Sequence, residues 1–193
     1  MSLDDNTLND FRHIPRKRFG QHWLKDQLVL DQIVNAAKLN SDDCVLEVGP
    51  GKGALTEKLI ESKAKFIQAI ELDRDLIVGL KRRFSHQQKF SLKEGDVLSV
   101  PLEAEDGLII NKVVANIPYN ITGPLLKRLI GELSKAPENS FETLVLLMQK
   151  EVAQRILALP GSSNFSALSV RIQLLAKCQD VCDVPSKCFQ PAP

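Results

Sequence analysis

A short stretch near the middle of the chain combines residue types that could hold a flat nitrogen base. The apolar run at 113–115 predicts a buried strand that ends at Asn116. Pro118 then restricts the backbone of the turn. The Asn116 amide oxygen and the Ile117 carbonyl could accept both protons of an exocyclic amine while Tyr119 stacks on the base. The alternative is a strand–turn–helix junction whose Asn caps the turn, and the motif alone does not separate the two.

A glycine-rich turn is the second candidate site. An apolar segment at 44–48 predicts a short buried strand, and glycines at 49, 51 and 53 precede a predicted helix over 54–62. Gly49 and Gly51 would let the backbone approach a ligand at the helix N-terminus. The G-x-G-x-G spacing indicates a nucleoside-containing cofactor, but it leaves nicotinamide and flavin cofactors open, because an alanine variant of the dinucleotide fingerprint exists.

Acidic residues follow the next two predicted strands. Glu71 ends the strand predicted over 65–72 and lies twenty residues beyond Gly51, where a carboxylate could accept both hydroxyls of a ribose. Asp73 and Asp75 are alternatives, although Asp73 suits the cap of the following helix. Asp96 follows the strand predicted over 90–94 and could accept a hydrogen bond from an adenine amine, or it could belong to a solvated turn.

Three consecutive cations near the N-terminus, Arg16, Lys17 and Arg18, precede aromatic and polar side chains that include His22 and Trp23. Positive charge beside stacking groups is typical of RNA-binding segments. A solvated basic turn followed by an aromatic contact to the core explains the same pattern equally well.

Composition limits the class of protein. The chain has 193 residues, 44% hydrophobic content and a formal net charge of +1, which predicts one main domain. Neither a membrane span nor a secretory signal is evident, so we expect a cytoplasmic protein, or an organellar one if a targeting segment has been removed. The spacing of the four cysteines predicts reduced thiols and no metal site.

Strand-like and helix-like segments alternate along the chain, which predicts an α/β fold with a central, mostly parallel sheet flanked by helices. Besides the segments already described, helices are expected over 27–39, 74–84, 123–133, 150–159 and 165–176, and strands over 143–148 and 181–184.

Taken together, the motifs resemble those of a known enzyme family. They are R-F-G-Q-H-W-L, E-V-G-P-G-K-G-A-L-T, I-E-L-D-R-D, E-G-D-V, A-N-I-P-Y-N-I, L-M-Q-K-E-V-A-Q-R, F-S-A-L-S-V and F-Q-P-A-P. From about residue 16 to 193 the chain is similar to the small-subunit ribosomal RNA adenine N6,N6-dimethyltransferases, relatives of the erythromycin-resistance methylases. The resemblance implies a Rossmann-like methyltransferase fold and S-adenosylmethionine as cofactor. It also implies that a monomer dimethylates two adjacent adenosines near the 3′ end of small-subunit rRNA, in ribosome biogenesis.

The resemblance also implies roles for individual residues. The reaction centre would be Asn116, Ile117, Pro118 and Tyr119, with the target adenine held between Tyr119 and Phe189. The cofactor would lie against His22, Leu24, Gly49, Gly51, Glu71, Asp96 and Asn116. The rRNA would meet Arg16, Lys17 and Arg18.

Two departures from the family pattern stand out. His22 occupies a position where the family commonly has Asn, which could make cofactor binding sensitive to pH. The family also continues past F-x-P-x-P into a last strand and a small helical domain. We therefore expect a mobile arm over 1–15, a catalytic domain over 16–193, and a sheet with one exposed edge.

Two other functions remain open. A DNA adenine N6-methyltransferase uses a related Asn-Pro-Pro-Tyr motif, which differs at Ile117. A non-catalytic RNA-binding or ribosome-assembly factor could retain the fold, although the intact Glu71, Asp96, Asn116 and Tyr119 favour an enzyme.

Overall fold

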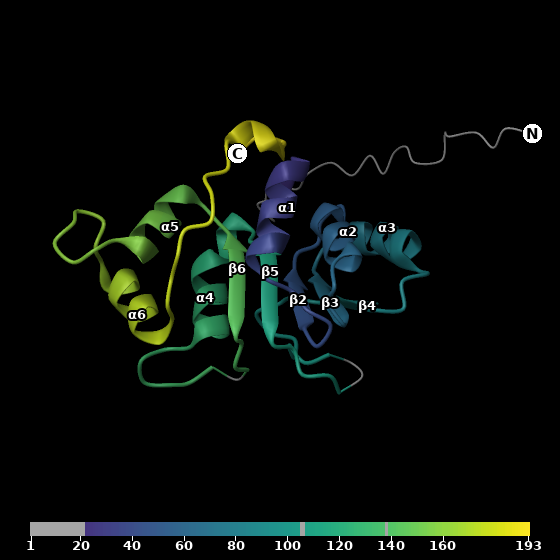
Figure 1. Cartoon of the computed structure of the whole chain (residues 1–193), viewed down its shortest axis with the longest axis horizontal. Coiled ribbons are helices and arrows are strands. Elements are labelled where there is room, and N and C mark those ends of the chain that lie inside the picture. Colours follow the sequence, from purple (N-terminus) through teal and green to yellow (C-terminus); the bar gives the residue numbers. More distant parts are fainter. Residues whose placement is uncertain (1–21, 105–106, 138) are drawn as a thin grey trace, which may run out of the picture.

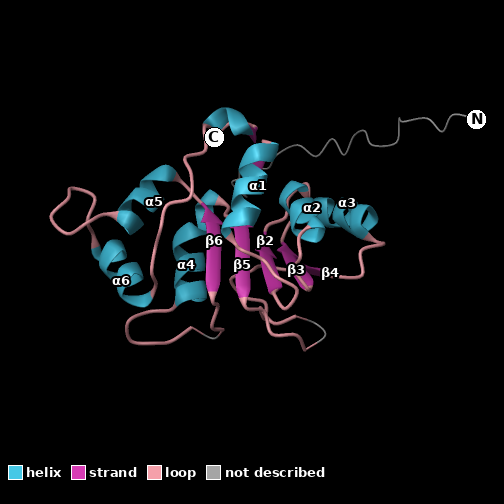
Figure 2. Cartoon of the chain, viewed as in Figure 1, coloured by secondary structure: helices cyan, strands magenta, loops and turns pink. Residues whose placement is uncertain are grey.

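A five-stranded parallel sheet forms the centre of the molecule (Figures 1 and 2). The computed structural model describes residues 22–104, 107–137 and 139–193. The strand order is β4-β3-β2-β5-β6, so the order along the chain reverses between β2 and β5. The predicted α/β class is confirmed. The strands are β2 (Cys44–Val48), β3 (Phe66–Glu71), β4 (Phe90–Glu94), β5 (Lys112–Asn116) and β6 (Thr143–Leu147).

Helices cover both faces of this sheet. The apolar side chains of α1 and α2 pack with Val45, Ile67 and Val114 on one face, and α3 packs against β4 on the same face. Helix α4 packs with Leu46 and Val113 on the other face, and α5 and α6 extend this layer beyond β6. The helices are α1 (Gln27–Ala36), α2 (Ala54–Glu61), α3 (Arg74–Phe84), α4 (Thr122–Ile130), α5 (Lys150–Leu157) and α6 (Ala167–Leu175).

Local capping agrees with the sequence patterns. The Asp26 carboxylate accepts hydrogen bonds from two backbone N–H groups at the start of α1, and Asp73 accepts one at the start of α3. Helix α1 ends earlier than predicted, because Lys38 has a φ of 47° and cannot continue a right-handed helix.

A small second sheet joins the two ends of the described chain. β1 (Trp23–Leu24) pairs antiparallel with β7 (Phe189–Gln190), and Lys25 N–H donates to the carbonyl of Cys188 at 2.9 Å. The sequence pattern did not predict this pairing. It brings the F-Q-P-A-P motif beside the start of α1.

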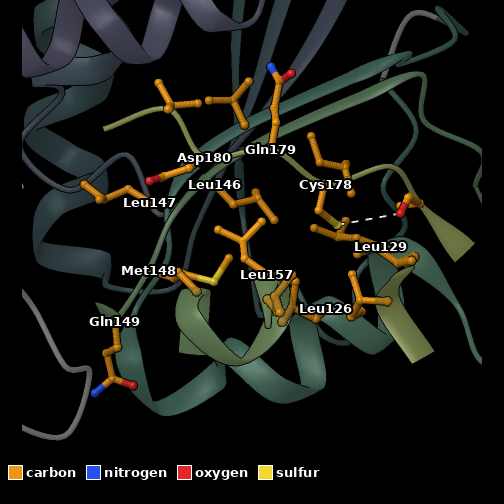
Figure 3. Close-up of a pocket in the computed structure, with 18 of the residues that line it drawn as sticks. Leu126, Leu129, Leu146, Leu147, Met148, Gln149, Leu157, Cys178, Gln179 and Asp180 are labelled. Atoms are coloured by element: carbon orange, nitrogen blue, oxygen red, sulfur yellow. Dashed lines mark hydrogen bonds between the residues drawn. The ribbon is translucent and has the colours of Figure 1, made fainter. Parts of the chain in front are cut away.

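The β6 side of the sheet opens onto a groove of about 1560 Å³. Among the described residues, β6 pairs only with β5, which agrees with the expected exposed edge. In Figure 3 the side chains of Leu146, Met148 and Leu157 point toward one another within this groove. The strand predicted over 181–184 is wrong, because residues 176–186 form the opposite wall of the groove and make no ladder with β6.

A buried ion pair anchors the amino-terminal end of the sheet. Lys112 Nζ lies 2.9 Å from Asp43 Oδ2 and donates to the carbonyls of Ala37 and Lys38. Burial by itself would raise the pKa of Asp43, but hydrogen bonds from Asn111, from a backbone N–H group and from Lys112 hold that pKa below its usual value. The pair therefore fixes the end of α1 against β5. No helix among the described residues is both long and apolar enough to cross a membrane.

Replacing Lys112 by Met should lower the free energy of unfolding by about 3 kcal/mol at pH 7, because it leaves the Asp43 carboxylate buried without its cation. The folded pKa of Asp43 lies below the unfolded value, so the contribution of the pair is present above about pH 4 and is lost as the pH falls through the folded pKa. The difference between variant and parent should therefore shrink in acid. Urea unfolding at several pH values measures both effects.

Lys127→Met is the matched control, since Lys127 pairs with Glu132 on the surface at 2.6 Å. It should change the free energy of unfolding by less than about 1 kcal/mol. Equal losses for the two variants would contradict a special role for the buried pair.

Candidate active site at the carboxyl ends of the strands

The predicted site residues follow neighbouring parallel strands at one edge of the sheet. Gly49 follows β2, Asp96 follows β4, and Glu71 and Asn116 are the last residues of β3 and β5. Glu47 pairs in register with Ala69 and with Val114, and Glu71 and Asn116 each lie two residues beyond those partners. Because side chains alternate along a strand, Glu47, Glu71 and Asn116 project from the same face.

A cavity of about 280 Å³ opens on that face. It contains three predicted site residues, Leu24, Gly49 and Asn116. Charged side chains surround its mouth, whereas its walls are largely apolar. The other lining residues are Trp23, Lys25, Gln27, Leu30, Glu47, Pro50, Lys52, Ala54, Leu55, Glu57, Arg83 and Gln190.

A hydrogen bond orients the amide of Asn116. Its Nδ2 donates to the backbone carbonyl of His22 at 3.0 Å. The His22 ring in turn donates through Nδ1 to the carbonyl of Pro191 at 3.1 Å, since a carbonyl can only accept. With Nδ2 engaged, Asn116 presents Oδ1 as the amide atom that can accept a hydrogen bond from a ligand.

The turn after Asn116 is held in place by the sheet. Ile117 is 1% exposed, and its N–H donates to the carbonyl of Leu147 at 2.9 Å. Pro118 has a φ of −58° and leads into a 3-10 helix over Tyr119–Ile121. The ring of Tyr119 stacks on His22 with centroids 5.2 Å apart, and burial and the Glu151 charge raise the pKa of its hydroxyl.

Phe189 does not form the predicted aromatic pair in this structure. It is 6% exposed and packs in the core with Leu24 and α1. One face of Tyr119 is covered by His22. Clamping of a base between Phe189 and Tyr119 stays a prediction, and it would require Phe189 to leave the core.

Glu71 lies at the tip of β3 and is largely satisfied by backbone donors. Oε2 accepts from Gly51 N–H at 3.1 Å, and Oε1 accepts from Leu72 and Asp73 N–H at 2.9 Å each. Burial raises the pKa of Glu71, although these hydrogen bonds act in the opposite direction. A carboxylate has about four acceptor positions. Three are occupied, so room remains for one ribose hydroxyl, and binding of both stays a prediction.

Asp96 lies beside Glu71 along the same edge. Gly95 N–H donates to the Glu71 carbonyl at 2.9 Å, which fixes the turn that carries Asp96. Asp96 Oδ1 accepts from Leu98 N–H at 2.9 Å, as in the turn that was the alternative interpretation. The second carboxylate oxygen remains available for a ligand amine.

Two residues with clear places in the site were not among the predicted cofactor ligands. Trp23 covers the glycine turn, and Lys52 Nζ lies 4.4 Å from its ring centroid. The sequence pattern indicated Trp23 only as a possible RNA-stacking group. Glu47 is fully buried within β2. An acid inside the otherwise apolar segment C-V-L-E-V was the signal that could have identified it.

Some predictions fall outside the described residues or concern absences. Arg16, Lys17, Arg18 and the arm over 1–15 lie outside the described residues. All four cysteines are free thiols in the structure. Within the described ranges, no group of three or more His, Cys, Asp or Glu side chains could hold a metal ion.

Gly51→Ala should destabilise the protein by about 2 kcal/mol or more. Gly51 has a φ of 59°, which costs an L-residue about 1–2 kcal/mol, and a Cβ there would lie 2.7 Å from Trp23 Cδ1. Gly123→Ala is the control, because a Cβ at this position in α4 meets open space and alanine favours a helix by about 0.5–1 kcal/mol. Thermal and urea unfolding distinguish the two, and equal stabilities would contradict the packing of Trp23 on the turn.

Comparison with known proteins identifies relatives over nearly the whole chain. The relatives described as "Ribosomal RNA small subunit methyltransferase A" from Prochlorococcus marinus strains NATL1A and NATL2A are each 88% identical over 189 residues. These matches cover 98% of this chain, and the chain spans 65% of the length of each relative.

Solved structures agree with the fold. A dimethyladenosine transferase from Plasmodium falciparum is 37% identical with a TM-score of 0.78, over 89% of this chain and 59% of that one. The 23S rRNA methyltransferase ErmE is 28% identical with a TM-score of 0.75, over 89% of this chain and 65% of that one. The fold is therefore the Rossmann-like methyltransferase fold that the motifs implied. A family model described as "Ribosomal RNA adenine dimethylase" matches residues 12–193, and the chain belongs to that family.

Proposed function

We propose that this chain is the catalytic part of an S-adenosylmethionine-dependent enzyme that dimethylates the N6 amines of two adjacent adenosines near the 3′ end of small-subunit rRNA. The observation that carries the proposal is the orientation of Asn116. Its Nδ2 is held by the His22 carbonyl, so Oδ1 is the atom presented at the end of β5 beside the cavity. The substrate, the immature small ribosomal subunit, and a cytoplasmic location belong to the same proposal.

The residues present fit the cofactor. Gly49 lines the cavity, and Gly51 N–H ties the glycine turn to Glu71. An acid at the tip of the second parallel strand suits a ribose. Asp96 retains one carboxylate oxygen for the adenine amine. When bound, the cofactor supplies an electrophilic methyl group on a sulfonium.

The chemistry asks the protein mainly to position the target amine. The lone pair of the adenine N6 is delocalised into the ring, so attack on a methyl group requires the amine to become more tetrahedral. Asn116 Oδ1 and the Ile117 carbonyl can accept its two protons and orient the lone pair. The new carbon–nitrogen bond replaces the carbon–sulfur bond, a thioether departs, and one proton passes from nitrogen to solvent. No strong general base is required.

The target adenosine must leave its stack to reach this pocket, at a cost of a few kcal/mol. Tyr119 offers an aromatic surface that helps to offset this cost once His22 moves from it. The stacked His22 ring therefore occupies the place that we assign to the base.

Asn116→Ala should lower methyl transfer by about 100-fold or more, because it removes an acceptor that acts on the reacting amine. The measurement is transfer of labelled methyl from S-adenosylmethionine to unmethylated small ribosomal subunits, with nucleoside analysis for N6,N6-dimethyladenosine. Calorimetric binding of S-adenosylhomocysteine should fall much less than the rate. Duplex DNA serves as an alternative substrate and should not be methylated.

Asn35→Ala is the control, since Asn35 is exposed on α1 and lies outside the cavity. It should leave transfer unchanged. Transfer that is equally fast in Asn116→Ala would refute the catalytic assignment. Cofactor binding without any methyl transfer by the parent chain would favour a non-catalytic assembly factor, and methylation of DNA would favour the other enzyme class.

A further inference from the structure

Glu47 is an acid buried in the floor of the site without a partner. It lies in the middle of the sheet, is 1% exposed and lines the cavity that also holds Gly49 and Asn116. Neither of its carboxylate oxygens makes a hydrogen bond with any part of the chain that the structure describes. The hydroxyl of Thr56, which packs from α2, is likewise without one.

Such an arrangement costs stability and brings no structural benefit. Buried polar atoms are nearly always hydrogen-bonded, and those that are not commonly belong to functional sites. Two other buried acids of this chain show the contrast, because Asp43 has Lys112 and Glu71 has three backbone donors. Glu47 therefore lacks a donor that a ligand could provide.

The proposed cofactor carries two cationic groups, a sulfonium and an α-ammonium. Only the ammonium has N–H groups, and it has three of them. Two unpaired carboxylate oxygens in a nearly dry cavity require hydrogen-bond donors as well as positive charge. The ammonium meets both requirements, whereas the sulfonium meets only the second.

We infer that Glu47 binds the α-ammonium group of S-adenosylmethionine from the floor of the cavity, an inference that rests on the proposed function. The role is specific to the amino-acid part of the cofactor. It differs from the roles of Glu71 and Asp96, which concern the ribose and the adenine.

The protonation of Glu47 makes this binding dependent on pH. Burial raises the pKa of Glu47 to about 8, and the charge of Glu71 on β3 acts in the same direction, whereas Thr56 lowers it. The free protein therefore holds this carboxyl mainly protonated at pH 7. When the ammonium binds, the carboxyl ionises and its proton passes to solvent.

The other charged groups around the cavity have partners of their own or lie at its mouth. Arg83 pairs with Glu57 at 2.8 Å and donates to the Lys52 carbonyl, and Lys52 Nζ rests on the Trp23 ring. Lys25 is exposed where the chain enters α1. None of these cations donates to Glu47.

Three adenosine ligands separate the possible contacts. S-adenosylmethionine has both cations, S-adenosylhomocysteine has only the ammonium, and 5′-methylthioadenosine has neither. Glu47→Gln should weaken the first two by roughly 10–100-fold, the range for hydrogen bonds to charged groups, and change the third less than about twofold. Glu57→Gln, at the exposed mouth of the same cavity, should change all three by less than about threefold. Calorimetry gives each affinity.

Proton release by the parent chain tests the same inference without a substitution. Calorimetry in buffers of different ionisation enthalpy should show close to one proton released for each S-adenosylhomocysteine bound at pH 7, and none for 5′-methylthioadenosine. Affinity for S-adenosylhomocysteine should rise about tenfold from pH 6 to pH 7. This range stays below the α-amino pKa of about 8.

Several results would overturn the inference. They are equal weakening of all three ligands by Glu47→Gln, weakening of S-adenosylmethionine alone, no weakening at all, and binding by the parent without proton release. If the parent chain binds none of the three ligands, the proposed function itself fails. If it binds 5′-methylthioadenosine and both cofactor forms with equal affinity and no proton release, only the role of Glu47 fails.

Discussion

Parallel pairing of β2 with both β3 and β5 is the constraint on which the site depends. Parallel strands end at the same edge of a sheet, and in-register partners present their side chains on the same face. The pairing therefore carries Glu47, Glu71 and Asn116 to one side of the molecule although long stretches of chain separate them. A shift of one residue between β2 and β5 would turn Asn116 away from the cavity.

The buried acids along this sheet show three solutions to one problem. Asp43 is neutralised by Lys112 at the amino-terminal end, where the pair fixes α1. Glu71 is held by backbone N–H groups that also shape the glycine turn. Glu47 has no partner in the described chain. The first two acids stabilise the framework, and the third stores an unmet interaction in the place where a cationic ligand would bind.

The small β1–β7 sheet links the framework to the reaction centre. Through it the backbone of His22 comes within reach of Asn116, and Pro191 comes within reach of the His22 ring. The same contacts place His22 on Tyr119. Residues from both ends of the described chain thus set the orientation of one amide and cover one aromatic face, so target-base binding requires a local rearrangement.

The sequence by itself determined the α/β class, most element positions and the caps at Asp26 and Asp73, because hydrophobic period and capping chemistry are local. Its motifs also identified the family. Only the tertiary structure decided that the segment 181–184 forms no strand, because a strand depends on a neighbour to pair with. It also decided that Trp23 covers the glycine turn, that Phe189 is buried, and that Glu47 lacks a partner. These properties arise from contacts between distant segments, and no local pattern encodes them.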